Sequence, residues 1–136
     1  MSIKGRVIVI DDEVNAATAL ETLLREDGYE VSRAHDAASG LALLEKTDAD
    51  VVLSDLRMPG MDGHAFHDKL RAERPGLAAR TVFITGDVLS NETRDTVQRQ
   101  PVLAKPFSFD QVEEAVIALL RGGAPFRPAE RPGVPR

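Results

Sequence analysis

Short apolar runs alternate along this chain with longer segments in which apolar residues recur every three or four positions. The runs are Arg6–Ile10, Asp50–Asp55, Thr81–Thr85 and the shorter Pro101–Ala104, and a fifth segment, Tyr29–Ala34, shows partial alternation of apolar and polar residues. Runs of this length that are rich in Val, Ile and Leu are typical of strands buried on both faces of a parallel sheet. The pattern therefore predicts five strands.

The segments between and after these runs predict five helices. The first is expected to end near Asp27, the third at Pro75 and the last at Gly122, where turn or helix-breaking residues follow the periodic pattern. The helices are expected to begin after Glu13, at Asp36 or Ser39, near Gly63, near Ser90, and at Ser108 or Asp110. Their apolar residues are Ala17, Leu20, Leu23, Leu24, Leu41, Leu43, Leu44, Phe66, Leu70, Val112, Val116, Leu119 and Leu120.

This alternation indicates an α/β fold in which right-handed crossovers connect parallel strands and helices cover both faces of the sheet. The expected architecture is a flavodoxin-like, doubly wound parallel sheet with strand order 2-1-3-4-5. One folded domain is expected over residues 1–122. Residues 123–136 are rich in Pro and Arg and are expected to form a flexible tail or linker.

Composition narrows the classes of function. The absence of Cys excludes disulfides, thiol catalysis and thiolate metal sites. The sequence shows no signal peptide and no membrane-spanning run, so a cytoplasmic protein without membrane insertion is expected. The net charge of −5 argues against direct nucleic-acid binding and is compatible with a metal cation or a basic partner.

Polar residues stand at the ends of four predicted strands. Asp11 and Asp12 follow the first strand, Asp55 ends the third, Thr85 ends the fourth, and Lys105 follows the fifth. The carboxyl ends of parallel strands meet at one edge of the sheet, where ligands bind in open α/β folds. These five side chains are therefore expected to converge on one pocket.

Each of these residues also has a purely structural explanation. Asp11 or Asp12 can cap the first helix, and Asp55 can begin an Asx turn. Thr85 can be an ordinary strand residue and Lys105 an ordinary exposed lysine. The combination favours a cation site, because three carboxylates in one pocket repel each other and one lysine cannot neutralise them. Hard oxygen ligands of this kind suit magnesium, Mg²⁺.

The same residues also describe a phosphoryl acceptor. A carboxylate can act as a nucleophile and form an aspartyl phosphate, and Asp55 is the candidate. Mg²⁺ and Lys105 would neutralise the phosphoryl oxygens during transfer. Thr85 could then hydrogen-bond one phosphoryl oxygen and draw its loop inward, which makes a two-state element controlled by a covalent charge.

Four motifs at these strand ends resemble those of the receiver domains of bacterial response regulators in two-component signalling. The resemblance extends over about residues 5–121. It implies a phosphoacceptor domain rather than an enzyme acting on a separate substrate, and the domain could belong to a hybrid histidine kinase. The motifs are Val-Ile-Asp-Asp-Glu at 9–13, Asp-Leu-Arg-Met-Pro-Gly-Met-Asp-Gly at 55–63, Ile-Thr-Gly at 84–86 and Lys-Pro-Phe at 105–107.

The resemblance implies a role for each site residue. Asp55 would accept the phosphoryl group from the phosphohistidine of a sensor histidine kinase or a histidine phosphotransfer protein. Asp11 and Asp12 would hold Mg²⁺ together with Asp55 and the backbone carbonyl of Arg57. Within the same resemblance, Thr85 is the switch hydroxyl.

The resemblance further implies that Lys105 pairs with the phosphoryl group and that a cis bond before Pro106 aims this lysine into the pocket. Two positions bear on signal output and phosphate lifetime. Val102 stands where many receivers carry an aromatic residue that rotates inward on activation, so output is expected to use other parts of the surface. Asp87, like Arg57, stands at a position that tunes phosphate lifetime in relatives.

Several alternatives remain open from the sequence. The chain can be a single-domain regulator or the receiver of a hybrid kinase, and a homodimer is compatible with either. A degenerate receiver that serves as a protein-interaction or dimerisation module is one rival function, and a haloacid-dehalogenase-type phosphotransferase is another. His35, His64 and His67 are too scattered to indicate a metal site, and His64 and His67 are expected to be solvated.

Overall fold

The computed structural model describes residues 3–56, 60, 63–86, 100–105 and 107–121. The strands are β1 (Arg6–Ile10), β2 (Glu30–Ala34), β3 (Val51–Asp55), β4 (Thr81–Thr85) and β5 (Val102–Ala104). The helices are α1 (Val14–Glu26), α2 (Ala37–Lys46), α3 (Gly63–Glu73), α4 (Pro75–Ala79) and α6 (Phe109–Leu120). Among the described residues, no helix is both long and apolar enough to cross a membrane.

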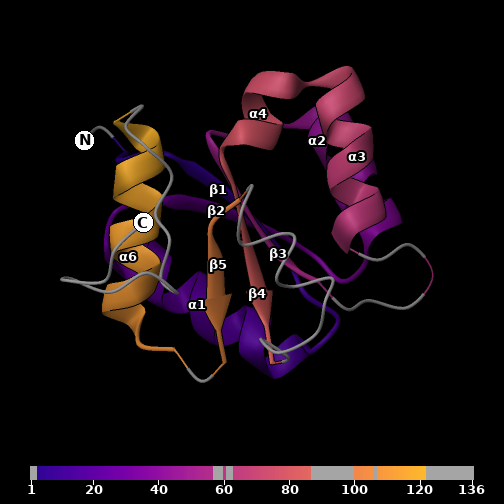
Figure 1. Ribbon diagram of the computed structural model, residues 1–136. Helices are drawn as coiled ribbons and strands as arrows, with labels where there is room; N and C mark the ends of the chain where they lie inside the picture. Colours follow the sequence, from indigo (N-terminus) through magenta and orange to yellow (C-terminus); the bar gives the residue numbers. More distant parts are fainter. Residues whose placement is uncertain (1–2, 57–59, 61–62, 87–99, 106, 122–136) are drawn as a thin grey trace, which may run out of the picture.

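The strands form one parallel sheet in the order β2-β1-β3-β4-β5 (Figure 1), which confirms the predicted fold. The pairing aligns the carboxyl ends of the central strands. Ile10 of β1 pairs with Ser54 of β3, and Asp55 pairs with Ile84 of β4. Thr85 pairs with Ala104, so the ends of β4 and β5 also coincide. The residues that follow these strands therefore start from the same edge.

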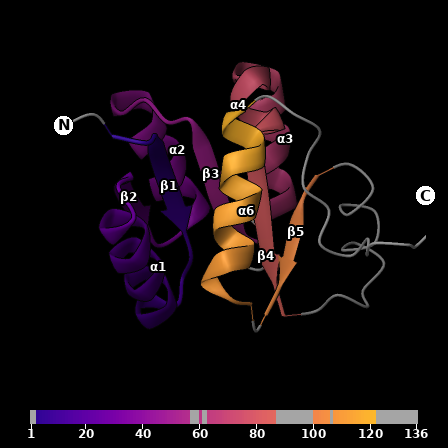
Figure 2. The same cartoon turned by 90° about the vertical axis from the view of Figure 1, so that its left-hand side faces the viewer.

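Side-chain alternation along the strands divides the core into two layers. Val7 and Val9 of β1 pack under α1 and α6, whereas Ile8 and Ile10 pack on the opposite face, under α2, α3 and α4. Figures 1 and 2 show α6 on one side of the sheet and α3 with α4 on the other. Burial on both faces explains why β1, β3 and β4 appear in the sequence as continuous apolar runs, whereas β2, at the edge of the sheet, is partly exposed and alternates.

The helix starts resolve two alternatives that the sequence left open. Asp36 caps α2, because its side chain accepts a hydrogen bond from the Ser39 N–H at 2.7 Å. Ser108 caps α6 in a capping box with Gln111, in which each side chain bonds the other residue's backbone N–H. One predicted apolar contact is wrong: Leu23 of α1 is 41% exposed, because it lies outside the face that Ala17, Leu20 and Leu24 bury.

The sequence pattern did not reveal helix α4. Pro75 was expected to end the third helix, and it does follow α3, but it is also the first residue of α4. Proline suits that position, because the first N–H of a helix has no partner within the helix. Leu77 and Ala78 bury α4 against the α2–α3 layer. The helix predicted near 90–98 and the tail predicted at 123–136 lie outside the described residues.

The packing of α2 on the sheet depends on one glycine. A Cβ atom on Gly40 would lie 2.5 Å from Cδ1 of Ile10 and 3.6 Å from the ring of Phe66. Both of those side chains are fully buried in the core. The lack of a side chain at Gly40 thus lets α2 approach β1 at the strand end that precedes Asp11.

We predict that Gly40→Val lowers the free energy of unfolding by about 2 kcal/mol or more, because the new side chain overpacks a filled core. Urea denaturation measures this loss. Ala38→Val is the matched control: the residue lies on the exposed side of the same helix, so the substitution should cost only about 0.5 kcal/mol of helix propensity. Equal losses for the two variants would contradict the close approach described at Gly40.

Candidate functional site

Three carboxylates gather at the carboxyl edge of the sheet. Asp11 and Asp12 follow β1, and Asp55 is the last residue of β3, the neighbouring strand. Each contributes one carboxylate oxygen to a group in which all three atoms lie within 4.8 Å of one another. Asp11 and Asp55 are buried, at 2% and 7% exposure, whereas Asp12 is exposed. The acidic residues selected from the sequence are therefore brought together in space.

Lys105 supplies positive charge to this group. Its Nζ lies 3.5 Å from Oδ2 of Asp55 and 3.8 Å from Oδ2 of Asp11, and its side chain is about one-third exposed. Lys105 directly follows β5, and its backbone N–H donates to the Thr85 carbonyl at 2.7 Å. One ammonium group faces three carboxylates, so the pocket keeps excess negative charge when the carboxylates are ionised. A bound cation would relieve that excess.

The buried position of Asp11 has an electrostatic consequence. Burial raises the pKa of the Asp11 carboxyl above its ordinary value, because the charged form loses hydration. The hydrogen bond from the Glu13 N–H, 2.9 Å long, and the charge of Lys105 lower the same pKa and oppose the rise. The expectation that Asp11 or Asp12 caps the first helix is wrong, because Glu13 is the N-cap of α1 and makes no side-chain capping bond; Asp11 accepts from the Glu13 N–H and also faces the pocket.

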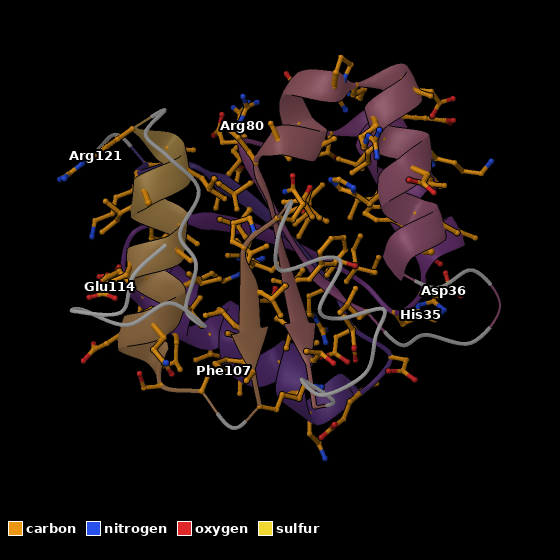
Figure 3. All side chains as sticks on the ribbon, in the orientation of Figure 1. His35, Asp36, Arg80, Phe107, Glu114 and Arg121 are labelled. Atoms are coloured by element: carbon orange, nitrogen blue, oxygen red, sulfur yellow. The ribbon has the colours of Figure 1, made fainter. Side chains whose placement is uncertain are left out.

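Thr85 lies at the same edge and is 1% exposed. Backbone hydrogen bonds tie the adjoining strand ends together, because the Leu56 N–H donates to Ile84 and the Lys105 N–H donates to Thr85. Figure 3 shows Phe107 beside the arrowhead end of β5 and Arg80 at the opposite end of the molecule. Arg57, the expected carbonyl ligand, and Pro106, with its expected cis bond, lie outside the described residues.

The acidic group fits a small divalent cation. Its ligand atoms are hard carboxylate oxygens, which Mg²⁺ prefers. Opposite ligands of an octahedral Mg²⁺ lie about 4.2 Å apart at a bond length of about 2.1 Å, so an oxygen group spanning 4.8 Å could close around one ion with small side-chain adjustments. Asp12 is exposed, which leaves room for the waters that Mg²⁺ retains.

A shallow cavity of about 290 Å³ adjoins the acidic group on the α1 side. Asp11 forms part of its wall, and His35 stands at its rim, largely exposed, with Nε2 3.5 Å from a carboxylate oxygen of Asp36. Figure 3 shows His35 and Asp36 close together beyond the end of α3. The remaining lining residues are Val14, Ala17, Arg33 and Ala34.

His67 corrects an expectation from the sequence. It was expected to be solvated, but it is buried at 9% exposure. Its Nε2 lies 2.9 Å from the Ala78 carbonyl oxygen and must be the donor, because a carbonyl can only accept. Its ring meets Phe83 edge to face, with centroids 5.3 Å apart. The available signal was its position beside Phe66 and three residues before Leu70, on the inner face of α3.

Comparison with known proteins identifies the class. The sequence model of the response regulator receiver domain matches residues 7–117, and the chain belongs to that family. It is therefore a phosphoacceptor signalling domain of the two-component type. The family match and the assembled acidic group favour this function over a haloacid-dehalogenase-type phosphotransferase and over a degenerate receiver.

Individual relatives agree with this family assignment. The chain is 33% identical over 115 residues to the probable transcriptional regulatory protein TcrX of Mycobacterium tuberculosis, covering 85% of this chain and 49% of that protein. It is 31% identical to the sensor histidine kinase GacS of Pseudomonas protegens, covering 93% of this chain and 15% of the kinase. The chain thus spans about half of the regulator and a small part of the kinase.

Solved structures show the same fold. The response regulator TrrA of Thermotoga maritima, determined in complex with Mg(2+)-BeF, superposes with a TM-score of 0.76 at 27% identity, covering 88% of this chain and all of that one. A CheY-like receiver domain protein of Methanospirillum hungatei superposes equally well, also with a TM-score of 0.76, at 26% identity and 90% coverage of this chain.

We predict that Asp11→Asn stabilises the metal-free protein at neutral pH. A raised pKa means that Asp11 contributes stability below the ordinary aspartate pKa of about 3.9, and that this contribution is lost as pH rises through the raised value. Asparagine carries no charge and keeps an oxygen acceptor for the Glu13 N–H. Thermal denaturation without divalent metal should show the gain in melting temperature at neutral pH and its decline towards about pH 4.

The same variant should respond less to metal. Mg²⁺ at ten times its dissociation constant stabilises a binding protein by about 1.4 kcal/mol, and Asp11→Asn should lose most of that effect. An equal rise in melting temperature on adding MgCl₂ to both proteins would contradict a role for Asp11 as a ligand.

Proposed function

We propose that Asp55 receives the phosphoryl group, and that the donor is a phosphohistidine on a sensor histidine kinase or a histidine phosphotransfer protein. The observation that carries the proposal is the grouping of the Asp55 carboxylate with Asp11 and Asp12 and with the Lys105 ammonium 3.5 Å away. Asp55 ends a central strand at the sheet edge where α/β proteins bind ligands. A carboxylate that attacks a negatively charged phosphoryl group needs positive charge nearby, because both reacting groups are anionic.

Asp11 and Asp12 would hold Mg²⁺ together with Asp55 and the backbone carbonyl of Arg57. Bound there, Mg²⁺ supplies positive charge to the phosphoryl oxygens. The donor set of the pocket supports this assignment, and so does the fact that the similar regulator TrrA was determined in complex with Mg(2+)-BeF. The role of Arg57 rests on the resemblance of its motif alone.

In the transfer step, one carboxylate oxygen of Asp55 attacks phosphorus and forms an O–P bond as the P–N bond of the phosphohistidine breaks. The electron pair of that bond stays on the imidazole nitrogen, and the histidine leaves as a neutral imidazole because its other ring nitrogen keeps its proton. Lys105 offsets the negative charge on the phosphoryl oxygens, which is the main task in phosphoryl transfer. Asp55 becomes an acyl phosphate.

After transfer, the Thr85 hydroxyl would hydrogen-bond a phosphoryl oxygen and act as the switch. Its position at the end of β4, beside the end of β3, supports this role. Val102, on β5 opposite Phe83, takes the place of the rotating aromatic of many relatives. The response to phosphorylation would therefore pass through other residues.

The setting of the domain is also part of the proposal. The partial coverage of both relatives is consistent with a single-domain regulator or with the receiver of a hybrid kinase. A cytoplasmic location, a folded unit over residues 1–122 with a flexible tail at 123–136, and a homodimer are compatible with either setting. Acetyl phosphate can stand in for the kinase as a phosphodonor in the tests below.

We predict that incubation with acetyl phosphate and Mg²⁺ adds one phosphoryl group to the protein, and that Asp55→Asn abolishes the addition. Intact-protein mass spectrometry measures the product, and hydroxylamine should release it, because an acyl phosphate is a reactive mixed anhydride. Asp48→Asn, which removes an exposed carboxylate before β3, should be phosphorylated like the wild type. Continued phosphorylation of Asp55→Asn would reject the assignment.

We predict that Lys105→Ala separates metal binding from phosphorylation. Removal of the ammonium leaves more negative charge in the pocket, so Mg²⁺ should bind as tightly as before or tighter. The rate of phosphorylation should fall by about 100-fold or more, the usual effect of losing one group that stabilises transition-state charge. Calorimetric titration with MgCl₂ and a phosphorylation time course measure the two effects, and a parallel loss of both would argue against this division of roles.

A further inference from the structure

A buried histidine links α3 to α4. The rings of His67 and of Phe83 on β4 meet edge to face at an interplanar angle of 72°. The Nε2 atom of His67 donates a hydrogen bond to the Ala78 carbonyl at 2.9 Å. An aromatic pair of this geometry and a buried hydrogen bond each favour one fixed orientation of the ring. The imidazole is therefore held between a strand and the short helix that the sequence pattern did not predict.

Phe83 connects this histidine to the phosphoacceptor. Because side chains alternate along a strand, Phe83 and Thr85 face the same side of the sheet. Phe83 is fully buried and forms a small cluster of its own with Leu56 and Val102, apart from the two main cores. Leu56 directly follows Asp55. A continuous series of packed groups thus leads from the acceptor residue to α4.

The series of packed groups ends at the Ala78 carbonyl, which accepts hydrogen bonds from both His67 and Gln100. Gln100 donates from Nε2 to the same Ala78 oxygen at 3.1 Å, and also to the Thr81 carbonyl at 2.9 Å. Thr81 in turn donates from its hydroxyl to Leu77 of α4 at 3.1 Å. Side-chain hydrogen bonds from His67 of α3, from Thr81 of β4 and from Gln100, two residues before β5, therefore hold α4 in its orientation. Phe83 reaches these bonds through its contact with His67.

We propose that His67 is a positioning residue for the phosphoacceptor switch: it couples occupation of the pocket at Asp55 to the orientation of α4, through Leu56 and Phe83. The inference rests on the proposed function of Asp55. It assigns the output of this chain to the α3–α4 side of the molecule, which suits a protein that carries Val102 at the usual aromatic position. Coupling is reciprocal, so a change at His67 must also alter binding at the pocket.

Titration with beryllofluoride in saturating Mg²⁺ tests the proposal without a kinase. The amide resonances of residues 76–79 of α4 should shift on binding in the wild type. His67→Leu should remove that shift and weaken beryllofluoride binding by about fivefold, near the lower end of common coupling effects. His67→Gln, which keeps a donor for the Ala78 carbonyl, should restore most of both. Phe83→Leu should also remove the shift, and it leaves the bond to Ala78 in place.

Leu119→Ala is the control for loss of stability alone. It truncates a buried side chain of α6 on the other face of the sheet, so it should lower the melting temperature and leave beryllofluoride affinity unchanged. Wild-type binding without a shift at residues 76–79, or His67→Leu and Leu119→Ala with the same affinity, would overturn the role of His67 and leave the function of Asp55 standing. Failure of the folded wild type to bind beryllofluoride would overturn both.

Discussion

The mutual repulsion of three carboxylates is the constraint on which the rest of this structure depends. Water would normally screen such charges, but the ends of β1 and β3 hold Asp11 and Asp55 out of solvent, where repulsion is stronger. The ammonium of Lys105 offsets part of the charge, and a divalent ion would offset the rest. The fold supplies the stability that keeps these groups together. The unbalanced negative charge of the pocket would favour binding of a cation, and in the proposed function that cation would offset the charge of an incoming phosphoryl group.

The sequence was sufficient to predict the sheet and the acidic pocket, for one physical reason. Parallel strands covered on both faces need unbroken apolar runs, and a polar residue at the end of such a run must lie at the sheet edge. Asp11, Asp55 and Lys105 could therefore be placed by counting strands. The expected order of the strands is the flavodoxin-like one, and the sequence pattern alone does not select it, since the rule of right-handed crossovers leaves more than one arrangement.

Other features could not be predicted from the sequence, because their environment depends on residues that are distant along the chain. His67 is polar, and only the Ala78 carbonyl and the ring of Phe83, neither of them near in sequence, make its burial favourable. Pro75 was interpreted as a terminator, although the same residue can end one helix and begin the next. Leu23 is apolar but stands off the buried face of α1 by part of a helical turn. In each case the local pattern was compatible with two environments, and tertiary packing selected one.

The anchoring of Lys105 has a consequence for the energetics of phosphate capture. Its backbone is held on one side by the hydrogen bond to Thr85, and three residues later the chain enters α6 through the Ser108 capping box. A lysine on a loose loop would lose much conformational entropy when it closes on an anion. Here the hydrogen bond to Thr85 already holds the Lys105 backbone, so in the proposed role of this lysine most of the remaining entropy cost would be that of its side chain. A phosphoryl group would then be met without first ordering the backbone from which the ammonium extends.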